Sequence, residues 1–233
     1  MNNNAYIDSN NNIIAHAIMM IEHLNEPWGI KDKNSHHVYM NKAALKFTNT
    51  PQHFAFEGKK DSEFPTQWSE LADDFVQHDN VTANTNRSVR VIETHYWNGN
   101  KCLTPYISEK IPLLNSQRES LGILWNAKEL IYINPLININ KRNPTVVTTE
   151  IKNTPFNRKE LNVIFLVLQN LSYKEIANIL NIAPRTVESR LKIIFKKTDV
   201  HSLYQLKGYC SHIGLDNYVP DSFLCKGLHF ITK

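Results

Sequence analysis

The chain has 233 residues, of which 42% are hydrophobic and 21% charged, as in ordinary globular proteins. This length is enough for two small domains, each with its own core. No apolar run reaches the roughly 18 residues that a membrane helix needs, and the Asn-rich start lacks the basic segment of a signal peptide. Three scattered cysteines indicate neither a disulfide framework nor a zinc site, so we expect a cytoplasmic protein with reduced thiols.

The net charge of +4 is unevenly distributed along the chain. Residues 1–150 carry 14 basic and 16 acidic side chains, whereas residues 151–214 carry 10 basic and 4 acidic ones. A basic block beside a near-neutral one indicates a polyanionic partner for the second part alone. Surface lysines that keep a helical domain soluble would give the same number of basic side chains. The charge therefore indicates nucleic acid only if the fold also presents a surface that fits it.

Near the start of the chain the spacing of apolar residues changes from one typical of a helix to one typical of strands. Residues 1–12 are polar and favour a disordered terminus, and the apolar spacing that follows predicts a helix over 13–24. Two short strands are expected on either side of a turn at 32–35. Asn41 suits the cap of a helix over 42–47.

The next stretch predicts one more helix and three strands. The helix spans roughly 69–81, and the strands fall within 88–97, 102–114 and 120–127. The first two strands flank Asn98-Gly99, a strong hairpin signal because both residues tolerate positive φ. Together these elements predict an α+β domain over residues 13–130, with an antiparallel five-stranded sheet, helices on one face, and an interior that is filled by core or holds a small ligand.

Residues 131–155 contain three prolines and no sustained period, so they predict a linker with at most a short strand. An all-α domain of four helices is then expected over 156–215, followed by a C-terminal tail over 216–233. Asn157 and Ser172 each open a helix with a Glu three residues later, which is the capping-box pattern. Pro184 begins a third helix at its first position. The short connection before Pro184 predicts a helix-turn-helix whose third helix can lie in the major groove of DNA.

The order of residues in this second domain resembles the LuxR/NarL-type DNA-binding domain. The resemblance runs from Phe156 to Val200 and includes E-I-A in the scaffold helix, T-V-E-x-R in the recognition helix, and I-F-x-K after it. Two residues depart from the family pattern: Ala183 stands where a Ser or Thr cap is usual, and Arg190 replaces a common His. The missing cap costs about 1 kcal/mol of helix stability, and neither change removes the surface that faces the groove.

The resemblance implies a role for each outward side chain of the recognition helix. The base-reading candidates are Glu188, Ser189 and Lys192, since Lys can bond guanine and Glu can accept from cytosine N4. The residues expected to anchor the DNA backbone are Lys174, Arg185, Thr186, Arg190, Lys196 and Lys197.

The first domain resembles a PAS domain. The residues that carry this resemblance are "WGIKDKNSHHVYMNKAALKFT", "GKKDSEFP" and the three-strand finish. A PAS sensor joined to a LuxR-type reader is the architecture of the VqmA-type quorum-sensing receptors, and the similarity runs nearly end to end. It implies a cytosolic homodimeric regulator whose sensor domain holds a small, partly polar heteroaromatic compound or another metabolite.

The resemblance also implies ligand-binding positions. Phe75 and Lys110 match an aromatic and a cationic position of the pocket in that group, and Ser108 stands where the group has another aromatic. Core packing is the alternative for Phe75, and a surface or ion-paired side chain is the alternative for Lys110. Three more aromatic residues either line the cavity or fill it: Tyr39, Tyr106 and Trp125.

Other classes of function remain to be weighed. His78 lies where haem-binding PAS sensors have a ligand, but a lone helix histidine is more often a core residue, so we expect a small organic ligand rather than haem. No catalytic or metal-binding motif is found, and the acidic cluster of a phosphorylated receiver domain is missing, so we expect no enzyme. The main rival is a PAS domain that serves only for dimerisation or for binding a protein partner.

Overall fold

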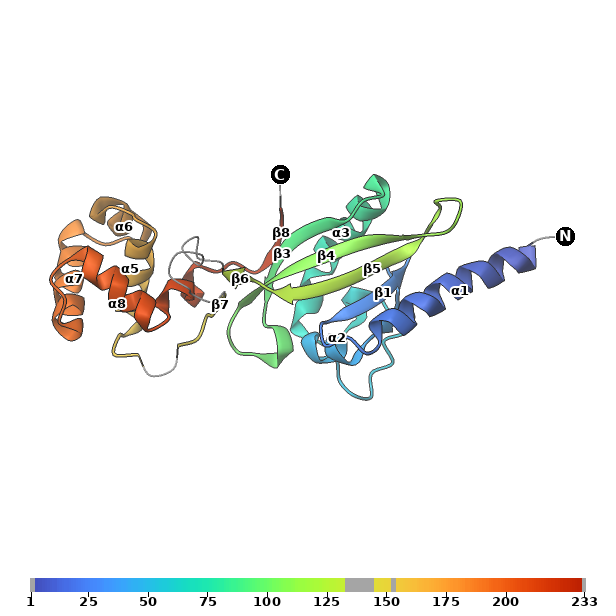
Figure 1. Cartoon of the computed structure of the whole chain (residues 1–233), viewed down its shortest axis with the longest axis horizontal. Helices are drawn as coiled ribbons and strands as arrows, with labels where there is room; N and C mark the ends of the chain where they lie inside the picture. Colours follow the sequence, from blue (N-terminus) through green and yellow to red (C-terminus); the bar gives the residue numbers. More distant parts are fainter. Residues whose placement is uncertain (1–2, 133–144, 152–153, 232–233) are drawn as a thin grey trace. The chain divides into compact units, whose positions relative to one another are not determined.

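Figure 1 shows the computed structural model of the chain, which describes residues 3–132, 145–151 and 154–231. The chain divides into two compact units, each described here by itself. Unit 1 comprises Met1–Leu130 together with Cys225–Lys233, and unit 2 comprises Ile131–Leu224. None of the helices in the described ranges has the length and apolarity that crossing a bilayer requires.

Unit 1 is built on a six-stranded antiparallel sheet with the strand order β2-β1-β5-β4-β3-β8. The strands are β1 (Trp28–Asp32), β2 (His37–Met40), β3 (Val89–His95), β4 (Thr104–Leu114), β5 (Ser120–Glu129) and β8 (Gly227–Phe230). The predicted α+β class is confirmed, and the five strands expected within residues 13–130 are present as β1–β5, with β8 added as a sixth strand. The sixth strand comes from the segment that we expected to be a tail. Four residues are too few for an alternation pattern, and β8 pairs with a strand more than 130 residues away in sequence.

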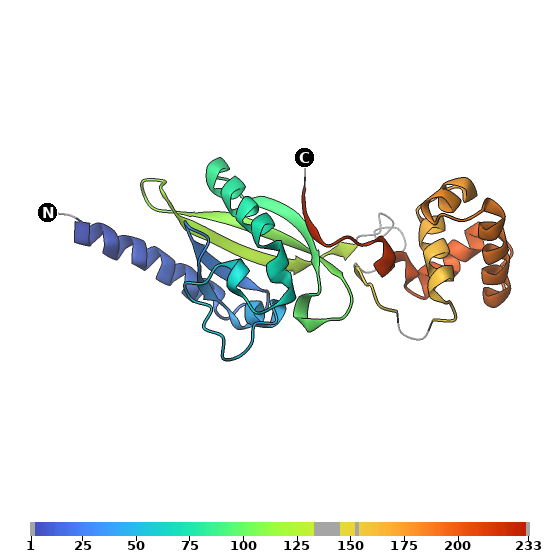
Figure 2. The same ribbon diagram turned by 180° about the vertical axis from the view of Figure 1, so that it is seen from behind.

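The helices of unit 1 are α1 (Asn3–Ile21), α2 (Lys42–Phe47) and α3 (Ala72–Thr85). Seen from behind, α3 runs across one face of the sheet (Figure 2). The helix α2 begins as predicted, because the Asn41 side chain accepts a hydrogen bond of 2.8 Å from the Ala44 N–H. The disorder expected over residues 1–12 is contradicted from Asn3 onward, since α1 begins there. A helix nucleated in the apolar half propagates at little cost into weaker helix-forming sequence.

The connection between β3 and β4 differs from a two-residue hairpin. Asn98 and Gly99 have positive φ angles of 57° and 70°, as expected, but they lie in a short 3-10 turn, Trp97–Gly99. Trp97 is only 2% exposed and stacks on Phe47 with ring centroids 4.4 Å apart. Because this indole is buried, the loop that joins β3 to β4 lies over the core and is longer than a two-residue turn.

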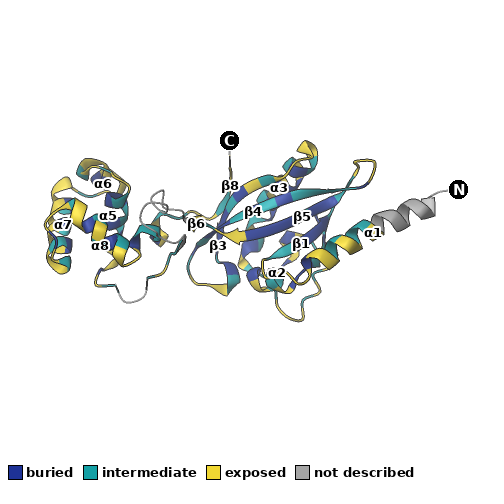
Figure 3. Ribbon diagram, in the orientation of Figure 1, coloured by how far each residue is buried: buried dark blue, intermediate teal, exposed yellow. Residues whose placement is uncertain are grey.

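Unit 2 contains the four helices predicted for it: α5 (Arg158–Leu168), α6 (Tyr173–Ile179), α7 (Pro184–Thr198) and α8 (Leu203–His212). Its core is largely aliphatic, with Ile164, Val187, Leu191, Ile194 and Leu206 at most 2% exposed. Figure 3 shows the alternation of buried and exposed residues along these helices. In the expected linker, β6 (Ile131–Tyr132) pairs with β7 (Thr145–Val146), and residues 133–144 and 152–153 lie outside the described residues.

Candidate functional site

The outward face of α7 is a row of polar and cationic side chains. Arg185, Ser189, Lys192 and Lys196 are all exposed and recur at helical spacing, so they form one stripe about 17 Å long. The Ser189 hydroxyl donates to the Arg185 carbonyl oxygen at 2.9 Å, which leaves its lone pairs available as acceptors. Glu188 is also exposed, beside this stripe. A row of this length fits the major groove of a DNA duplex.

The two helices before α7 each begin with a capping box of local hydrogen bonds. The capping box of α5 is formed by Asn157 and Glu160, whose backbone N–H donates to Asn157 Oδ1 at 3.0 Å. The capping box of α6 is formed by Ser172 and Glu175. By contrast, the first turn of α7 has Pro184 at N1 and no side-chain cap on Ala183. Both capping boxes predicted from the sequence are present.

The other predicted DNA contacts differ in their surroundings. Lys174 is exposed on α6, whereas Thr186 and Arg190 are half-buried at the flank of α7. Lys197 is the exception, because its ammonium group donates to Glu160 at 2.8 Å and to the Pro155 carbonyl oxygen at 3.1 Å. The Lys197 charge therefore stabilises the start of α5, and it is less available to DNA than the charge of Lys196.

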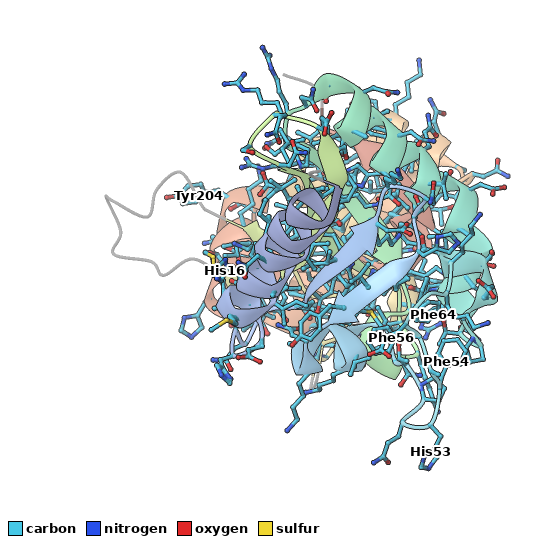
Figure 4. The ribbon with its side chains drawn as sticks, turned by 90° about the vertical axis from the view of Figure 1, so that its right-hand side faces the viewer. His16, His53, Phe54, Phe56, Phe64 and Tyr204 are labelled. Atoms are coloured by element: carbon cyan, nitrogen blue, oxygen red, sulfur yellow. The ribbon has the colours of Figure 1, made fainter. Side chains whose placement is uncertain are left out.

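Unit 1 contains a small, partly open cavity of about 40 Å³ between the sheet, α3 and the loop that follows α2. Phe54 and Phe64 of this loop pack with ring centroids 5.0 Å apart, and Figure 4 shows them grouped with Phe56 on one side of the domain. The residues that line the cavity are Lys31, His37, Phe47, Thr48, Asp61, Trp68, Phe75, Glu93, Trp97, Ser108, Lys110 and Trp125.

Two buried lysines and two buried aspartates are paired at this cavity. Lys31 on β1 forms ion pairs with Asp61 and, at 3.3 Å, with Asp79 on α3. Lys110 on β4 also pairs with Asp79 and donates to the Phe75 carbonyl oxygen at 2.7 Å. All four side chains are 4% exposed, and their charges balance. The ammonium groups lie 5.8 and 5.7 Å from the centroid of the Phe75 ring, within the range of cation–π attraction.

Burial and pairing shift the protonation of the cluster. Burial alone would raise the pKa of Asp61, but Lys31 and His37 hold it well below its usual range. Burial lowers the pKa of His37, so the neutral imidazole donates from Nε2 to Asp61 at 2.9 Å. Burial also raises the pKa of Glu93 to about 7, against the opposing effect of Lys110. The cavity therefore contains a carboxyl group that changes charge near neutral pH.

Two indole N–H groups of the cavity wall have no hydrogen-bond partner among the residues that the structure describes. Trp97 and Trp125 are 2% and 7% exposed, and Nε1 of each is buried without an acceptor. A buried donor that lacks an acceptor is costly, so both groups favour an acceptor atom within the cavity. Gly29 on β1 makes room for the Trp125 indole, since a Cβ atom there would lie 2.5 Å from the ring.

The structure brings four of the six predicted ligand residues to the cavity: Phe75, Ser108, Lys110 and Trp125. Tyr106 does not line it and instead packs in the core with its hydroxyl 3.1 Å from Asn98 Nδ2, and Tyr39 is a half-buried residue of β2 outside the lining. The sequence reading missed Lys31, His37, Asp61, Glu93 and Trp97. Lys31 and Glu93 gave a sequence signal, as charged residues within strand patterns, but such residues usually face water. Asp61 and Trp97 lie in turns outside the strands and gave no such signal.

His78 and the remaining histidines do not form a metal site in the described part of the chain. His78 is fully buried on α3, and its Nε2 bonds the Val89 carbonyl oxygen at 3.0 Å. Burial lowers its pKa to about 3. The imidazole therefore joins α3 to β3 and is not part of the cavity lining.

Comparison with protein families finds one match in each unit. Residues 154–209 match the family described as bacterial regulatory proteins, luxR family, and residues 21–130 match the PAS fold. No curated protein matches the chain.

Two solved structures are similar over nearly the whole chain. VqmA of Vibrio cholerae, solved in a complex with ligand and DNA, is 23% identical with a TM-score of 0.75, and the match covers 94% of this chain and 97% of that one. A phage VqmA in complex with DPO is 20% identical with a TM-score of 0.71, over 97% of this chain and 100% of that one. At these identities the similarity shows a common fold, and it confirms the resemblance predicted from the sequence at that level.

Proposed function

We propose that this chain, which joins a PAS fold to a luxR-family regulatory domain, is a cytoplasmic transcriptional regulator that binds promoter DNA as a homodimer and senses a small molecule. Unit 2 reads DNA through α7, and unit 1 holds the ligand in its cavity. The observation that carries the proposal is the exposed cationic stripe of α7 within a luxR-type domain. The similar VqmA structures contain ligand and DNA or DPO, which supports the same division of labour here.

The side chains of α7 divide into two roles. Glu188, Ser189 and Lys192 read base edges, since each offers hydrogen-bonding groups on the exposed face. The backbone contacts come from the cationic and hydroxyl groups around them: Lys174, Arg185, Thr186, Arg190 and Lys196. Lys197 contributes less, because Glu160 already holds its ammonium group. An acidic side chain among these cations repels phosphate, so Glu188 favours sequence-specific over general binding.

Two substitutions test these roles by fluorescence anisotropy on a duplex selected from a random library. Lys192→Ala relaxes the preference at one or two base pairs, at a cost of about 1–3 kcal/mol for the preferred site. Lys196→Ala weakens all sequences alike and lowers the salt slope by about 1. Lys159→Ala, which removes an exposed charge on α5, is the matched control and leaves the preference unchanged. If both α7 variants lose affinity uniformly, the division of roles is wrong.

The chemistry of the cavity lining is complementary to a small, uncharged, planar molecule with hydrogen-bond acceptors. The two lysines and two aspartates already neutralise one another, so a charged ligand would leave an unpaired charge in the interior. The unpartnered indoles of Trp97 and Trp125 supply two donors, and the Phe75 ring supplies an aromatic face. A polar heteroaromatic compound satisfies all of these groups.

Native mass spectrometry of the freshly purified protein tests the ligand. We expect a dimer that carries one small molecule per chain and no haem. Trp125→Phe removes one unpartnered donor and reduces the ligand-bound fraction. Trp28→Phe is the matched control, because its indole N–H is also buried without a partner but lies outside the cavity lining. A dimer with no bound molecule would favour the rival function, in which the PAS domain only dimerises or binds a protein.

The sheet connects the cavity to both ends of the DNA-binding unit. Glu129, Tyr106, Glu93 and Leu228 lie in one row across β5, β4, β3 and β8. The chain leaves for unit 2 just after Glu129 and returns just before Gly227, and Glu93 in the same row lines the cavity. A ligand that moves β3 therefore acts on both attachment points of unit 2 at once.

In a dimer this movement changes the spacing of two recognition helices, which must enter successive major grooves about 34 Å apart. A chain that ends after Leu224 lacks β8 and keeps one attachment only. We expect it to bind DNA while its response to ligand is lost, which anisotropy with and without added ligand measures. An unchanged response would exclude β8 from the coupling.

A further inference from the structure

One apolar side chain stands on the charged outward face of α7. Ile193 is 50% exposed and is not one of the buried residues that form the hydrophobic core of unit 2. It directly follows Lys192, and Lys196 comes one turn later. The opposite face of the same helix is held in the core by Val187, Leu191 and Ile194.

The helical geometry places Ile193 at one edge of the DNA-facing stripe, beside Ser189. At about 100° per residue, Ile193 lies about 40° around the helix axis from Ser189 and about 60° from Lys196. Residues three and four apart on a helix are surface neighbours, so the isoleucine contributes to the same surface as these two side chains. The exposed stripe that we assign to DNA therefore includes one branched apolar group.

The charges around Ile193 favour DNA over a protein as the partner that contacts it. Arg185, Lys192 and Lys196 are exposed, and among the described residues none of them has a carboxylate partner within ion-pair distance. An apolar protein surface pressed against this face would bury these cations without partners, at a high cost. A DNA duplex meets the cations with phosphates, and the apolar group that its major groove presents is the C5-methyl of thymine.

We propose that Ile193 is a specificity-determining residue that contacts the methyl group of a thymine in the operator. This inference rests on the proposed function, because it requires that α7 enters the major groove. It adds an apolar contact to the hydrogen bonds assigned to Glu188, Ser189 and Lys192. The recognition surface therefore reads an A·T pair by shape and hydrophobicity in addition to the pairs read by polar groups.

The test replaces thymine by deoxyuridine, which lacks only the methyl group. The full-length protein first selects its preferred site from a random duplex library, and each thymine of that site is then replaced in turn. Fluorescence anisotropy at fixed salt gives the affinities of wild type, Ile193→Ala, Ile193→Val and Ile179→Ala. Ile179 on α6 is the matched control, since it is an isoleucine with an exposed fraction of 51%.

At one or two positions we expect deoxyuridine to weaken wild-type binding about fourfold, the factor that corresponds to one buried methyl group. Ile193→Ala binds the thymine duplex more weakly than wild type does, and its affinity does not fall further when that thymine is replaced by deoxyuridine. Ile193→Val loses part of its affinity on the same replacement. Ile179→Ala keeps the full wild-type dependence.

Two results would overturn the inference. One is a wild type that tolerates every replacement, and the other is an Ile193→Ala protein that remains as sensitive to deoxyuridine as wild type. Failure to select any preferred site is a different outcome, because it contradicts the proposed DNA-binding function itself. The two failures are therefore distinguishable in one set of measurements.

Discussion

The interiors of the two units are built from different chemistry. The core of unit 2 is largely aliphatic, and its functional side chains lie outside, on α7. The interior of unit 1 combines a cluster of aromatic rings with five buried ionisable residues that line one cavity: Lys31, His37, Asp61, Glu93 and Lys110.

This difference shows that the functional residues are separate from the stabilising core in unit 2 and are part of that core in unit 1. Unit 2 can change its outward side chains with little effect on its fold, because surface substitutions usually alter stability by less than about 0.5 kcal/mol. In unit 1 the groups that we assign to the ligand also hold the domain together. A change in ligand preference there requires a change in the core.

Removal of one buried carboxylate is the strongest test of this contrast. Asp79→Ala leaves the ammonium groups of Lys31 and Lys110 with one carboxylate between them. We expect unit 1 to lose about 3–5 kcal/mol of unfolding free energy, the usual cost of an unpaired buried charge. All four tryptophans belong to unit 1, so denaturation followed by tryptophan fluorescence reports this unit alone.

Asp73→Ala is the matched control, because Asp73 is an exposed residue of the same helix. Its fluorescence transition stays within about 0.5 kcal/mol of wild type. The double variant Asp79→Leu, Lys110→Met removes one cation together with the carboxylate and leaves the Lys31–Asp61 pair in place, and we expect it to recover much of the loss. If Asp79→Ala behaves like Asp73→Ala, the buried charges do not stabilise unit 1.

The exterior site of unit 2 was predictable from the sequence because all of its determinants are local. Helical spacing separated Val187, Leu191 and Ile194 from the outward residues, and the capping pairs marked the helix starts. Each of these signals spans at most a few turns. The resemblance to the luxR family added the roles of individual side chains, which spacing alone did not give.

The interior site of unit 1 was only partly predictable because it depends on pairing between distant segments. Lys31, Asp61 and Asp79 come from β1, a loop and α3, and nothing in their spacing says that they meet. A lysine in a strand pattern is ordinarily read as solvent-facing, and Lys110 was recovered through the family resemblance. The β8 strand was missed for the same reason, since its partner β3 lies far away in the chain.

The titration of Glu93 gives a second, smaller test of the charged interior. Burial raises the pKa of Glu93 from 4.5 to about 7. Between these values the native unit holds a proton on Glu93 that the unfolded chain has lost, so the contribution of Glu93 to stability falls as the pH rises from about 4.5 to 7. Glu93→Gln stays neutral throughout. Wild type therefore loses about 3 kcal/mol relative to Glu93→Gln over this interval.

The difference between the two proteins isolates Glu93, since Asp61, Asp79 and the buried histidines are common to both. Tryptophan fluorescence during denaturation at several pH values measures it. Glu129→Gln changes an exposed residue in the same row of the sheet and serves as the control. A constant difference between wild type and Glu93→Gln from pH 4.5 to 8 would show that Glu93 keeps an ordinary pKa inside the fold.

The smallest expected effect concerns unit 2 alone, where a local change should remain local. Ala183 begins α7 without a side-chain cap, so Ala183→Ser gives the first turn an acceptor for one of its free N–H groups. We expect a gain of about 1 kcal/mol in unit 2, read by far-UV circular dichroism, and no change in the tryptophan transition of unit 1. Ser172→Ala should cost α6 a similar amount, because it removes an existing cap. A shift of the tryptophan transition by either substitution would show that the two units unfold together. The unfolding free energy of the polar interior of unit 1 would then depend on that of the aliphatic core of unit 2.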